Sequence, residues 1–527
     1  MAGVGVCGGL GGGFQAVGYR HRKIGGHSFG RGVVTPRNRS LEVNGCETRG
    51  GTRLVVGTDL MGVRGRLTRH NHGVSVSASS VDTSDECVEE TTTTSNRPPL
   101  RVLFAAGGTG GHVFPAVAVA DALVERSNGD TLPYNRQVEI HFAGTAGRQE
   151  SKLVPNAGYD LHLIPAVSLA RPLFSPVNML KNLILPFRLA WCLLKAIQLV
   201  KKINPHVVVG TGGYVSFPVC LAAWIKKIPM CVQEQNAFPG IANRVLATVA
   251  TKVFVAFREA ADTLLRAETM KIHGNPTRGS LRTIPRSDAR RQIRFWFDMQ
   301  CGVGYKGQLM DDSLESLEKL KNDPDSSKKL NKSFVLLILG GSLGAGAINK
   351  AVGRIVPKLL EEHPDLWILW QTGDAGYDKS ARDIQTSFPK KKTKSRENKN
   401  NPHPRLSIVP FIDRMDVTYG ACDLVVARAG AVTCAELVAT KSPAVLIPSP
   451  NVAEDHQTKN AVALKEIGVA EVLPEAELSG GNALYTMVTT LLTDLDRLTQ
   501  MSSAAAAKDT PNAAEEIAED VARLAKR

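Results

Sequence analysis

His112 is the one titratable side chain within the glycine-rich segment "GGTGGH", residues 107–112. An imidazole has an unperturbed pKa of ~6.5, so it can take up or release a proton near neutral pH. The glycines before it can present backbone N–H groups to an anion at the start of a helix. The segment is therefore suited to chemistry beside a bound phosphate, with His112 acting either as a base or as a neutral hydrogen-bonding group that orients a substrate.

Two familiar nucleotide-binding patterns are absent from this segment. A Walker A loop requires Lys followed by Ser or Thr after its second glycine, and no lysine follows here. A dinucleotide fingerprint begins at Gly108 and Gly110, but its third glycine position is occupied by Val113. What remains is a glycine turn suited to an anion, or a tight strand-to-helix turn without a ligand.

Similar segments recur along the chain. Further glycine turns follow apolar runs at "GTGGYVSFP" (210–218) and "GGSLGAG" (340–346). Amide, acidic and cationic side chains gather in four more segments: "QEQNAFPG" (233–240), "HGNPTR" (273–278), "RAGAVTCAE" (428–436) and "EDHQTKNA" (454–461). One glycine turn is weak evidence for a ligand site, whereas this ordered set indicates one.

The elements that must position these segments are short apolar strands alternating with helices. The strands are expected at "RVLFAA", "QVEIHFAGT", "HVVVGTGG", "PMCVQEQ" and "KVFVAF", and then at "SFVLLIL", "WILWQTG", "LSIVPFI", "DLVVARAG" and "PAVLIPSP". Continuous apolar strands between helices predict parallel sheets covered on both faces. We expect an α/β protein with two Rossmann-like domains facing a cleft, and ligands beyond the carboxyl ends of the strands.

The composition shifts predict five segments. They are a disordered leader (1–98), a first Rossmann-like domain (99–275), a linker with a charged insertion (276–332), a second Rossmann-like domain (333–505) and a helical tail (506–527). A basic loop near 388–404 is expected to be a solvated insertion.

The net charge of +14 is concentrated in a few places. Residues 1–80 hold eleven Lys or Arg and three Asp or Glu, residues 390–399 hold six and one, and residues 161–233 hold eight and none. This distribution argues against a general polyanion binder, so no nucleic-acid partner is expected. The nine cysteines form no Cys-x-x-Cys pair, which favours reduced, structural thiols.

The leader is rich in Gly, Arg, Ser and Thr and poor in acids at first. It lacks the compact apolar core of a secretory signal and is typical of an organelle transit peptide, with a plastid favoured over a mitochondrion. A disordered tail that carries no address is the alternative.

Residues 177–202 combine a basic stripe with large apolar side chains. Lys181, Arg188, Lys195 and Lys202 recur every seven residues, although Pro186 interrupts the helical phase. No segment is long and apolar enough to span a bilayer. An element that lies at a membrane surface and a core helix with solvated lysines are both compatible with this pattern.

Taken together, the ordered segments resemble the MurG family of N-acetylglucosaminyltransferases over residues 99–500, apart from the insertions. The matching stretches are "GGTGGHVFPAVAVA", "GTGGYVSFP", "QEQNAFPGIANR", "GNPTR", "LGGSLGAGAIN", "FIDRM", "RAGAVTCAEL" and "EDHQTKNA". The resemblance implies a GT-B fold and inverting transfer of GlcNAc from UDP-GlcNAc to the 4-hydroxyl of MurNAc in a polyprenyl-diphosphate acceptor. It also implies peripheral contact with a membrane through residues 177–202.

The resemblance assigns roles residue by residue. His112 is the candidate catalytic residue. The implied acceptor-binding residues are Thr109, Gly110, Gly111, Gly213, Tyr214 and Asn236. The implied donor-binding residues are Arg278, Gly341, Ser342, Phe411, Ile412, Glu436, His456, Gln457 and Asn460. No Asp-x-Asp pair occurs in the matched core, so neither a metal nor another cofactor is expected.

Two other functions stay open from the sequence. The same fold could transfer galactose from UDP-galactose to diacylglycerol, as plastid galactolipid synthases do. The chain could also be a catalytically silent membrane scaffold derived from the same family. With a plastid leader, the GlcNAc transferase implied by the resemblance would lie on the stromal face of the inner envelope membrane.

Overall fold

The computed structural model describes residues 98–128, 136–167, 175–265, 267–277, 279–282, 284–300, 333–341, 344–388 and 403–525. The expected leader lies outside these residues except for its last position. The basic loop near 388–404 and the later part of the 276–332 segment also lie largely outside them. Both sheets described below lie in one compact unit, residues 90–527.

The first sheet has seven strands, all paired in parallel, in the order β3-β2-β1-β4-β5-β6-β7. Its strands are β1 (Leu100–Ala106), β2 (Val138–Gly144), β3 (Asp160–Leu163), β4 (Val207–Gly212), β5 (Met230–Glu234), β6 (Lys252–Val255) and β7 (Met270–Ile272). The helices between them are α1 (Gly110–Asn128), α2 (Glu150–Asn156), α3 (Pro176–Leu183), α4 (Leu185–Ile203), α5 (Gly213–Ile225), α6 (Ile241–Ala247) and α7 (Arg258–Thr263).

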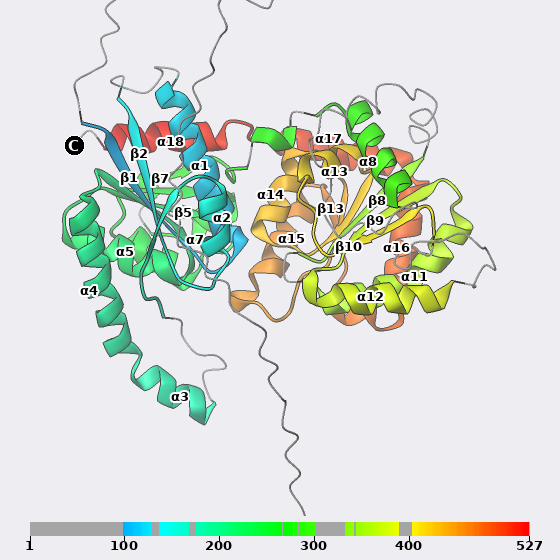
Figure 1. Ribbon diagram of the computed structural model, residues 1–527, viewed down its shortest axis with the longest axis horizontal. Coiled ribbons are helices and arrows are strands. Elements are labelled where there is room, and N and C mark those ends of the chain that lie inside the picture. Colours follow the sequence, from blue (N-terminus) through cyan, green and yellow to red (C-terminus); the bar gives the residue numbers. More distant parts are fainter. Residues whose placement is uncertain are drawn as a thin grey trace, which may run out of the picture. The chain divides into compact units, whose positions relative to one another are not determined.

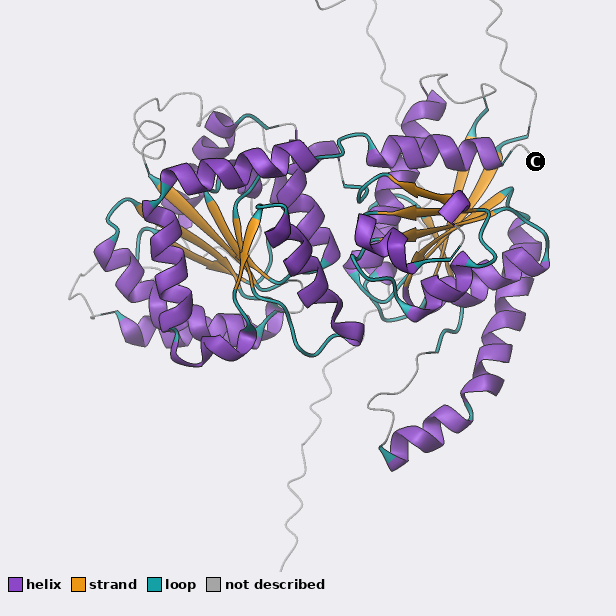
Figure 2. Cartoon of the chain, turned by 180° about the vertical axis from the view of Figure 1, so that it is seen from behind, coloured by secondary structure: helices purple, strands orange, loops and turns teal. Residues whose placement is uncertain are grey.

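The second sheet has six parallel strands in the order β10-β9-β8-β11-β12-β13. Figure 2 shows the strands of both sheets in orange with helices packed around them. Its strands are β8 (Phe334–Leu339), β9 (Leu366–Gln371), β10 (Leu406–Val409), β11 (Leu424–Ala427), β12 (Ala444–Leu446) and β13 (Ala470–Val472). Its helices are α8 (Arg286–Gln300), α11 (Gly346–Glu362), α12 (Asp374–Ser387), α13 (Met415–Ala421), α14 (Ala431–Ala439), α15 (His456–Glu466), α16 (Asn482–Thr493) and α17 (Leu495–Lys508). Two parallel α/β sheets confirm the fold class.

Alternation of side chains along the strands explains why both faces of each sheet are covered. On β1, Val102 and Phe104 enter one apolar core while Leu103 and Ala105 enter the core on the opposite face. The strand β8 divides in the same way between the two cores of the second sheet. Successive side chains of a strand point to opposite faces, so a continuous apolar run is buried on both sides.

Two helices from the expected linker and the expected tail pack into the cores of the two sheets. The last helix, α18 (Ala513–Leu524), packs on α1, and Ile517, Ala518 and Val521 join the core of the first sheet (Figure 1). The helix α8 falls in the expected linker, yet Ile293 and Phe297 are buried in a core of the second sheet. Both helices are amphipathic, and an apolar stripe must be buried against some partner that helical periodicity alone does not identify.

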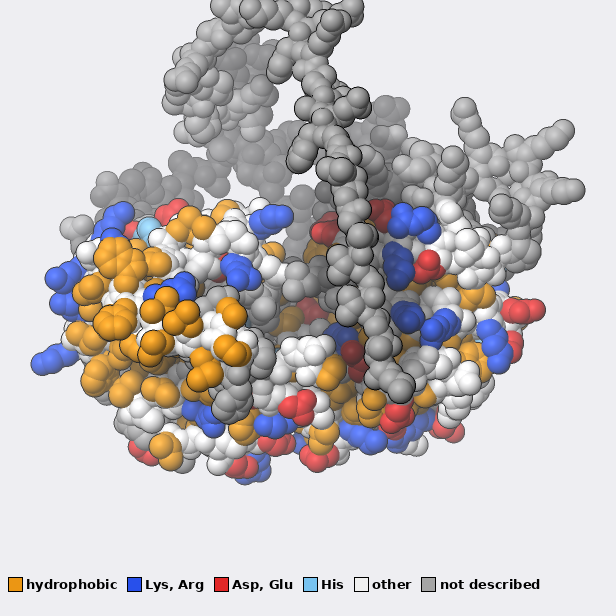
Figure 3. All heavy atoms as spheres, turned by 90° about the horizontal axis from the view of Figure 1, so that it is seen from below, with side chains coloured by type: hydrophobic (Ala, Val, Ile, Leu, Met, Phe, Trp, Pro, Cys, Tyr) orange, Lys and Arg blue, Asp and Glu red, His pale blue; other side chains and the backbone are white. Residues whose placement is uncertain are grey.

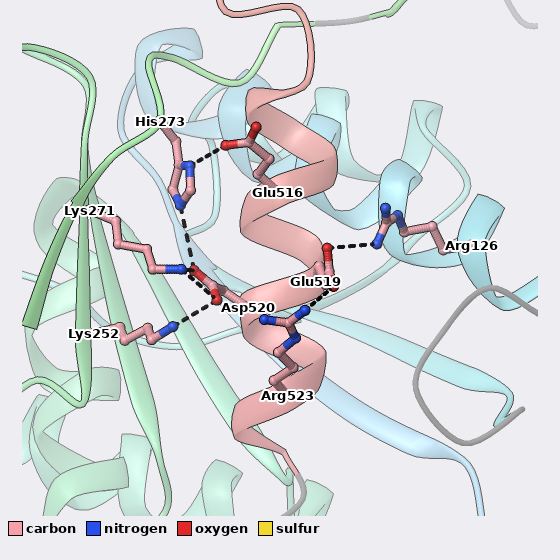
Figure 4. A network of polar contacts seen from close by, with 8 residues as sticks. All are labelled: Arg126, Lys252, Lys271, His273, Glu516, Glu519, Asp520 and Arg523. Carbon is pink, nitrogen blue, oxygen red and sulfur yellow. Dashed lines mark hydrogen bonds and ion pairs between the residues drawn. The ribbon is translucent and has the colours of Figure 1, made fainter.

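A polar network fixes α18 to the strands beside it (Figure 4). The buried Asp520 carboxylate lies 2.7 Å from Lys252 Nζ and 2.8 Å from Lys271 Nζ. His273 Nδ1 lies 2.5 Å from Glu516 on the preceding turn of the helix. Burial alone would raise the pKa of Asp520, but hydrogen bonds and charge from both lysines outweigh it and hold that pKa below its ordinary value.

Replacing Asp520 with asparagine should therefore destabilise the chain by about 1–3 kcal/mol, because Lys252 and Lys271 lose a buried charged partner. Urea unfolding of full-length protein measures this, and limited proteolysis reports release of α18. The matched control is Glu519→Gln, on the same helix but more exposed, where a change of about 0.5 kcal/mol or less is expected. Equal effects of the two substitutions would contradict the role given to Asp520.

Candidate functional site

Two glycine loops of the first sheet interlock. Gly213, the first residue of α5 directly after β4, has a φ of +80°, and a Cβ on it would lie only 2.0 Å from the carbonyl oxygen of Gly107 in the loop before α1. The close approach leaves no room for a Cβ, and glycine is the residue that adopts such a φ without strain. Neither α1 nor α5 has an acidic residue in its first turn, so both helix N-termini can face an anion.

A buried carboxylate supports the loop before α1. Glu150 begins α2 and is fully buried. Its two oxygens accept hydrogen bonds from Gly108 N at 2.9 Å, Thr145 N at 3.1 Å and Thr145 Oγ1 at 2.5 Å. The Glu150 carboxylate therefore fixes the path of the loop at Gly108.

His112 lies in the first turn of α1, where the two loops meet. Its ring Nδ1 is 3.1 Å from the carbonyl oxygen of Thr211, and the Thr211 hydroxyl in turn donates to the His112 carbonyl at 2.7 Å. A Cβ on Gly212 would lie 2.6 Å from the same Nδ1, so the ring fits only against a glycine. Burial lowers the pKa of His112, although the charge of Glu234 acts in the opposite direction. Because the pKa is lowered, the imidazole is neutral at neutral pH.

The other expected acceptor residues surround this point. Thr109 is exposed, and its carbonyl oxygen accepts from His112 N at 3.1 Å. Gly110 and Gly111 are the first two residues of α1. Tyr214 is the second residue of α5 and is 56% exposed, so its phenol is open to solvent at the helix start.

Asn236 and Asn460 are hydrogen-bonded to each other across the two sheets. Asn460 Nδ2 donates to Asn236 Oδ1 at 3.2 Å, and Asn460 Oδ1 accepts from Ala237 N at 2.8 Å. Asn236 Nδ2 donates to Glu234, which also accepts from Asn243. An expected acceptor residue and an expected donor residue are thus brought together. Their contacts with sugars stay predictions, since both amides bind within the protein here.

The glycine loop of the second sheet that is expected to bind the donor is described in part. Gly341 and Gly344 have φ values of +74° and +80°, and a Cβ on Gly344 would lie 2.6 Å from the Thr372 carbonyl oxygen. This loop leads into α11, whose first turn holds no acidic residue. Ser342 and Arg278 lie outside the described residues, so their expected contacts with phosphate stay predictions.

Phe411 and Ile412, the two residues expected to contact the uracil of the donor, differ in exposure. Phe411 is 41% exposed, whereas Ile412 is buried, and Ile412 N donates to Gln371 Oε1 at 3.0 Å. The Phe411 ring therefore offers an apolar surface. The Ile412 amide is already satisfied by Gln371.

Glu436 lies on α14 and is held by a buried tyrosine. Tyr419 Oη donates to Glu436 Oε2 at 3.1 Å, and burial and the Glu436 charge raise the pKa of Tyr419. Glu436 also lines a small cavity with residues of both sheets. The other lining residues are Phe114, Asn275, Pro276, Thr277, Val432 and Ala435. Tyr419 thus orients a carboxylate beside α1, where it could accept from a sugar hydroxyl.

The two remaining donor candidates begin α15. His456 is its first residue, and its charge is close enough to lower the pKa of His112. Gln457 Oε1 accepts from Ser449 N at 2.9 Å, which ties α15 to the loop after β12. The structure therefore gathers His456, Asn460 and Asn236 near His112.

Residues 177–202 form two helices, because Pro186 ends the helical phase between α3 and α4. Large apolar side chains are exposed along them: Val177, Met179, Leu180, Leu183, Ile184, Phe187, Trp191 and Leu194. We call these residues the apolar patch, and Figure 3 shows apolar side chains gathered with Lys and Arg on this face. Lys195 Nζ lies 4.6 Å from the Trp191 ring centre. Across the described ranges, no helix has the length and hydropathy needed to span a bilayer.

Sequence reasoning missed the residues that hold the site from behind. Glu150, Thr211, Gln233, Gln235 and Asn275 are all buried polar side chains. A buried polar group must be hydrogen-bonded. The amide side chains within the apolar strand "PMCVQEQ" were therefore the one available sign that a buried polar network lies there. Their partners lie up to 156 residues away, which the spacing could not indicate.

Family models match both halves of the chain. Residues 102–255 match the glycosyltransferase family 28 N-terminal domain, and residues 335–517 match the glycosyltransferase family 28 C-terminal domain. The two matched ranges contain the first sheet up to β6 and the whole second sheet.

Curated relatives match over nearly their whole length. The UDP-N-acetylglucosamine–N-acetylmuramyl-(pentapeptide) pyrophosphoryl-undecaprenol N-acetylglucosamine transferase of Salinibacter ruber is 42% identical over 433 residues, covering 82% of this chain and 99% of that protein. The protein of the same name from Chlorobaculum tepidum is 36% identical, covering 81% and 100%. The crystal structure of Acinetobacter baumannii MurG matches with a TM-score of 0.54 and 26% identity, covering 81% and 100%.

Proposed function

This chain belongs to the MurG family within glycosyltransferase family 28, and we propose that it transfers GlcNAc from UDP-GlcNAc to the 4-hydroxyl of MurNAc in a polyprenyl-diphosphate-linked acceptor, converting lipid I to lipid II. The relatives are named as N-acetylglucosamine transferases that act on UDP-N-acetylglucosamine and an N-acetylmuramyl-(pentapeptide) pyrophosphoryl-undecaprenol. Within the site, the interlocked glycine loops with His112 at their junction are the observation that carries the proposal.

In the proposed reaction, the acceptor hydroxyl loses its proton and UDP is the leaving group. The acceptor 4-oxygen attacks the anomeric carbon of GlcNAc, the new oxygen–carbon bond forms, and the bond from that carbon to the UDP phosphate oxygen breaks. His112 takes the hydroxyl proton at Nε2, and the electron pair leaves with UDP. Inversion follows because the acceptor attacks the face opposite the departing diphosphate.

Positive ends of helices stabilise the two diphosphates. The N-termini of α1 and α5 face the acceptor diphosphate, and the loop before α11 faces the UDP phosphates. Arg278 and Ser342 complete the donor side. Glu436, oriented by Tyr419, accepts from the ribose hydroxyls, while Phe411 packs on the uracil.

The direct test offers two radiolabelled donors to purified full-length protein. With UDP-GlcNAc and a MurNAc-containing polyprenyl diphosphate, label should enter the lipid fraction. With UDP-galactose and diacylglycerol, none should enter. Galactose transfer without GlcNAc transfer would replace the proposal with the galactolipid activity, and no transfer from either donor would favour a silent scaffold.

The apolar patch brings the acceptor loops to the membrane that holds the lipid. The eight large apolar side chains of the patch are exposed on α3, on α4 and at Ile184 between them, and Arg188 and Lys195 lie on α4. A protein surface of this composition can bury apolar groups at the headgroup boundary while its cations face anionic lipid.

Leu183→Glu should weaken binding to vesicles of anionic phospholipid about tenfold or more, because Leu183 is 71% exposed in the apolar patch and its burial in lipid is worth about 1.5–3 kcal/mol. Cosedimentation measures the bound fraction. Leu495→Glu is the matched control, since Leu495 is 60% exposed at the start of α17 on the second sheet. Equal weakening by both substitutions would argue for bulk charge, and no weakening by Leu183→Glu would remove the patch from the proposal.

The leader is the basis for a plastid location, at the stromal face of the inner envelope. Residues 1–98 fused to a fluorescent protein should accumulate in plastids of plant or algal cells. Accumulation in mitochondria, or a diffuse distribution, would overturn this location without touching the enzymatic proposal.

A further inference from the structure

Three side-chain amides connect His112 to the start of α14. They belong to Gln235, Gln233 and Asn275, and all three are buried. Each hydrogen-bonds to the next, and at the far end Asn275 reaches the carbonyl oxygen of Ala431, the first residue of α14. Because an amide has one donating and one accepting end, the orientation of each member constrains its neighbours.

The orientation of the far end is set by main-chain carbonyls. Asn275 Nδ2 lies 2.9 Å from the carbonyl oxygen of Gln235 and 3.4 Å from that of Ala431, and a carbonyl can only accept. Asn275 Oδ1 therefore faces Gln233 Nε2, at 3.2 Å. This leaves Gln233 Oε1 as the acceptor that faces Gln235.

A second, independent contact gives the same orientation for the side-chain amide of Gln235. Gln235 Nε2 lies 2.5 Å from the carbonyl oxygen of Thr211, so the atom at that position must be the donor. The same Nε2 also donates to Gln233 Oε1. Gln235 Oε1 consequently points at His112, where it lies 3.2 Å from Nδ1.

His112 Nδ1 thus faces two acceptors, Gln235 Oε1 and the Thr211 carbonyl oxygen at 3.1 Å. A neutral imidazole satisfies them only when Nδ1 carries the proton, which leaves a lone pair on Nε2. We propose that Gln235 is a positioning residue that fixes His112 as its Nδ1–H tautomer and so prepares Nε2 to receive the acceptor proton. This inference rests on the proposed function for its consequence, but not for the tautomer itself.

The charged groups near His112 act on its protonation and not on the choice between its nitrogens. Glu234 favours the imidazolium, but its carboxylate is engaged by Asn236, Gly240 and Asn243 and it offers no contact to the ring. His456, at the start of α15, opposes the imidazolium. Burial acts in the same direction as His456 and outweighs Glu234, so the neutral form whose tautomer Gln235 selects is the form present at neutral pH.

The tautomer can be measured without substrate. Full-length protein with isotope-labelled histidine should show a His112 ring with Nδ1 protonated and Nε2 unprotonated at pH 7.5, assigned by its loss in His112→Gln among the 12 histidines. In Gln235→Leu, part of the population should move to the Nε2–H form, since the Thr211 carbonyl alone remains. An Nε2–H ring in the unsubstituted protein, or an unchanged ring in Gln235→Leu, would overturn the proposal.

Kinetics supply a readout that a merely structural role would not move. Gln235→Leu should lower kcat by about tenfold to a hundredfold, with the KM for UDP-GlcNAc changed less than about twofold. Gln235→Glu keeps an acceptor toward Nδ1, and its second oxygen can donate to the Thr211 carbonyl oxygen when the carboxyl group is protonated. This variant should therefore keep the Nδ1–H tautomer and more of kcat than Gln235→Leu does. A Gln235→Glu enzyme that keeps the tautomer but loses as much kcat as Gln235→Leu would contradict the assignment.

A buried amide elsewhere controls for general destabilisation. Asn349, on α11, lies between Trp370 Nε1 at 3.1 Å and the Thr372 carbonyl oxygen at 2.8 Å. Asn349→Leu should lower stability as Gln235→Leu does, yet leave the His112 tautomer unchanged. If the unsubstituted protein shows the expected tautomer but transfers no GlcNAc, the proposed function fails while the tautomer assignment stands.

Discussion

His112→Ala is expected to lower kcat for GlcNAc transfer by about 10²- to 10⁴-fold, the usual contribution of a positioned general base. The ring lies where two glycine loops meet, and its Nδ1 is held by Thr211 and Gln235. Without it, the acceptor hydroxyl must lose its proton to water. The KM for UDP-GlcNAc should stay within about threefold, because the expected donor contacts belong to the second sheet.

His162→Ala is the matched control for this substitution. His162 lies on β3, where it is 3.3 Å from His141 Nδ1 and outside the acceptor loops. Its replacement should leave kcat within about twofold. A His112→Ala enzyme that keeps its kcat but binds the lipid acceptor more weakly would assign His112 to orienting the acceptor instead.

The pH dependence follows from the lowered pKa of His112. Burial disfavours the imidazolium, so the neutral base persists below the ordinary histidine pKa of ~6.5. Activity should therefore be retained as the pH falls through 6.5 and be lost only at lower pH, along an acid limb of kcat/KM. An acid limb centred above pH 6.5 would contradict a buried neutral base.

The sheets could be predicted because their strands are long apolar runs. Ten expected strands are present, whereas β3, β7 and β13 were not expected. These three have only three or four residues each and lie near or at the edges of their sheets. A run this short carries little periodicity, and a partly exposed edge strand needs no apolar pattern on both faces.

The glycine loops could be located from the sequence, but the polar residues behind them could not. Asn460 meets Asn236 from 224 positions away, and Gln235 meets His112 from 123 positions away. Hydrogen bonds of this kind depend on how strands are ordered in a sheet and how helices return to it. The docking of α18 on α1 escaped prediction for the same reason, since an amphipathic helix does not identify its partner.

Gly213→Ala is expected to cost more than about 3 kcal/mol of stability or to displace the loop before α1, which is proposed to bind the acceptor. Two effects add at this position. A φ of +80° is strained for any residue with a Cβ, by about 1–3 kcal/mol, and the new methyl group would lie 2.0 Å from the Gly107 carbonyl oxygen. That oxygen is backbone of a loop fixed by Glu150, so it cannot move aside cheaply.

Two other glycines separate the strain from the collision. Gly108 has a φ of +92° but open space around its Cβ position, so Gly108→Ala should show the strain alone, about 1–3 kcal/mol. Gly480 is exposed, has no positive φ and has open space, so Gly480→Ala should be within about 0.5 kcal/mol of the unsubstituted protein. Urea unfolding ranks the three. If Gly213→Ala is no worse than Gly108→Ala, the two loops do not need to interlock as closely as the structure has them, and kcat/KM for the lipid acceptor should then survive as well.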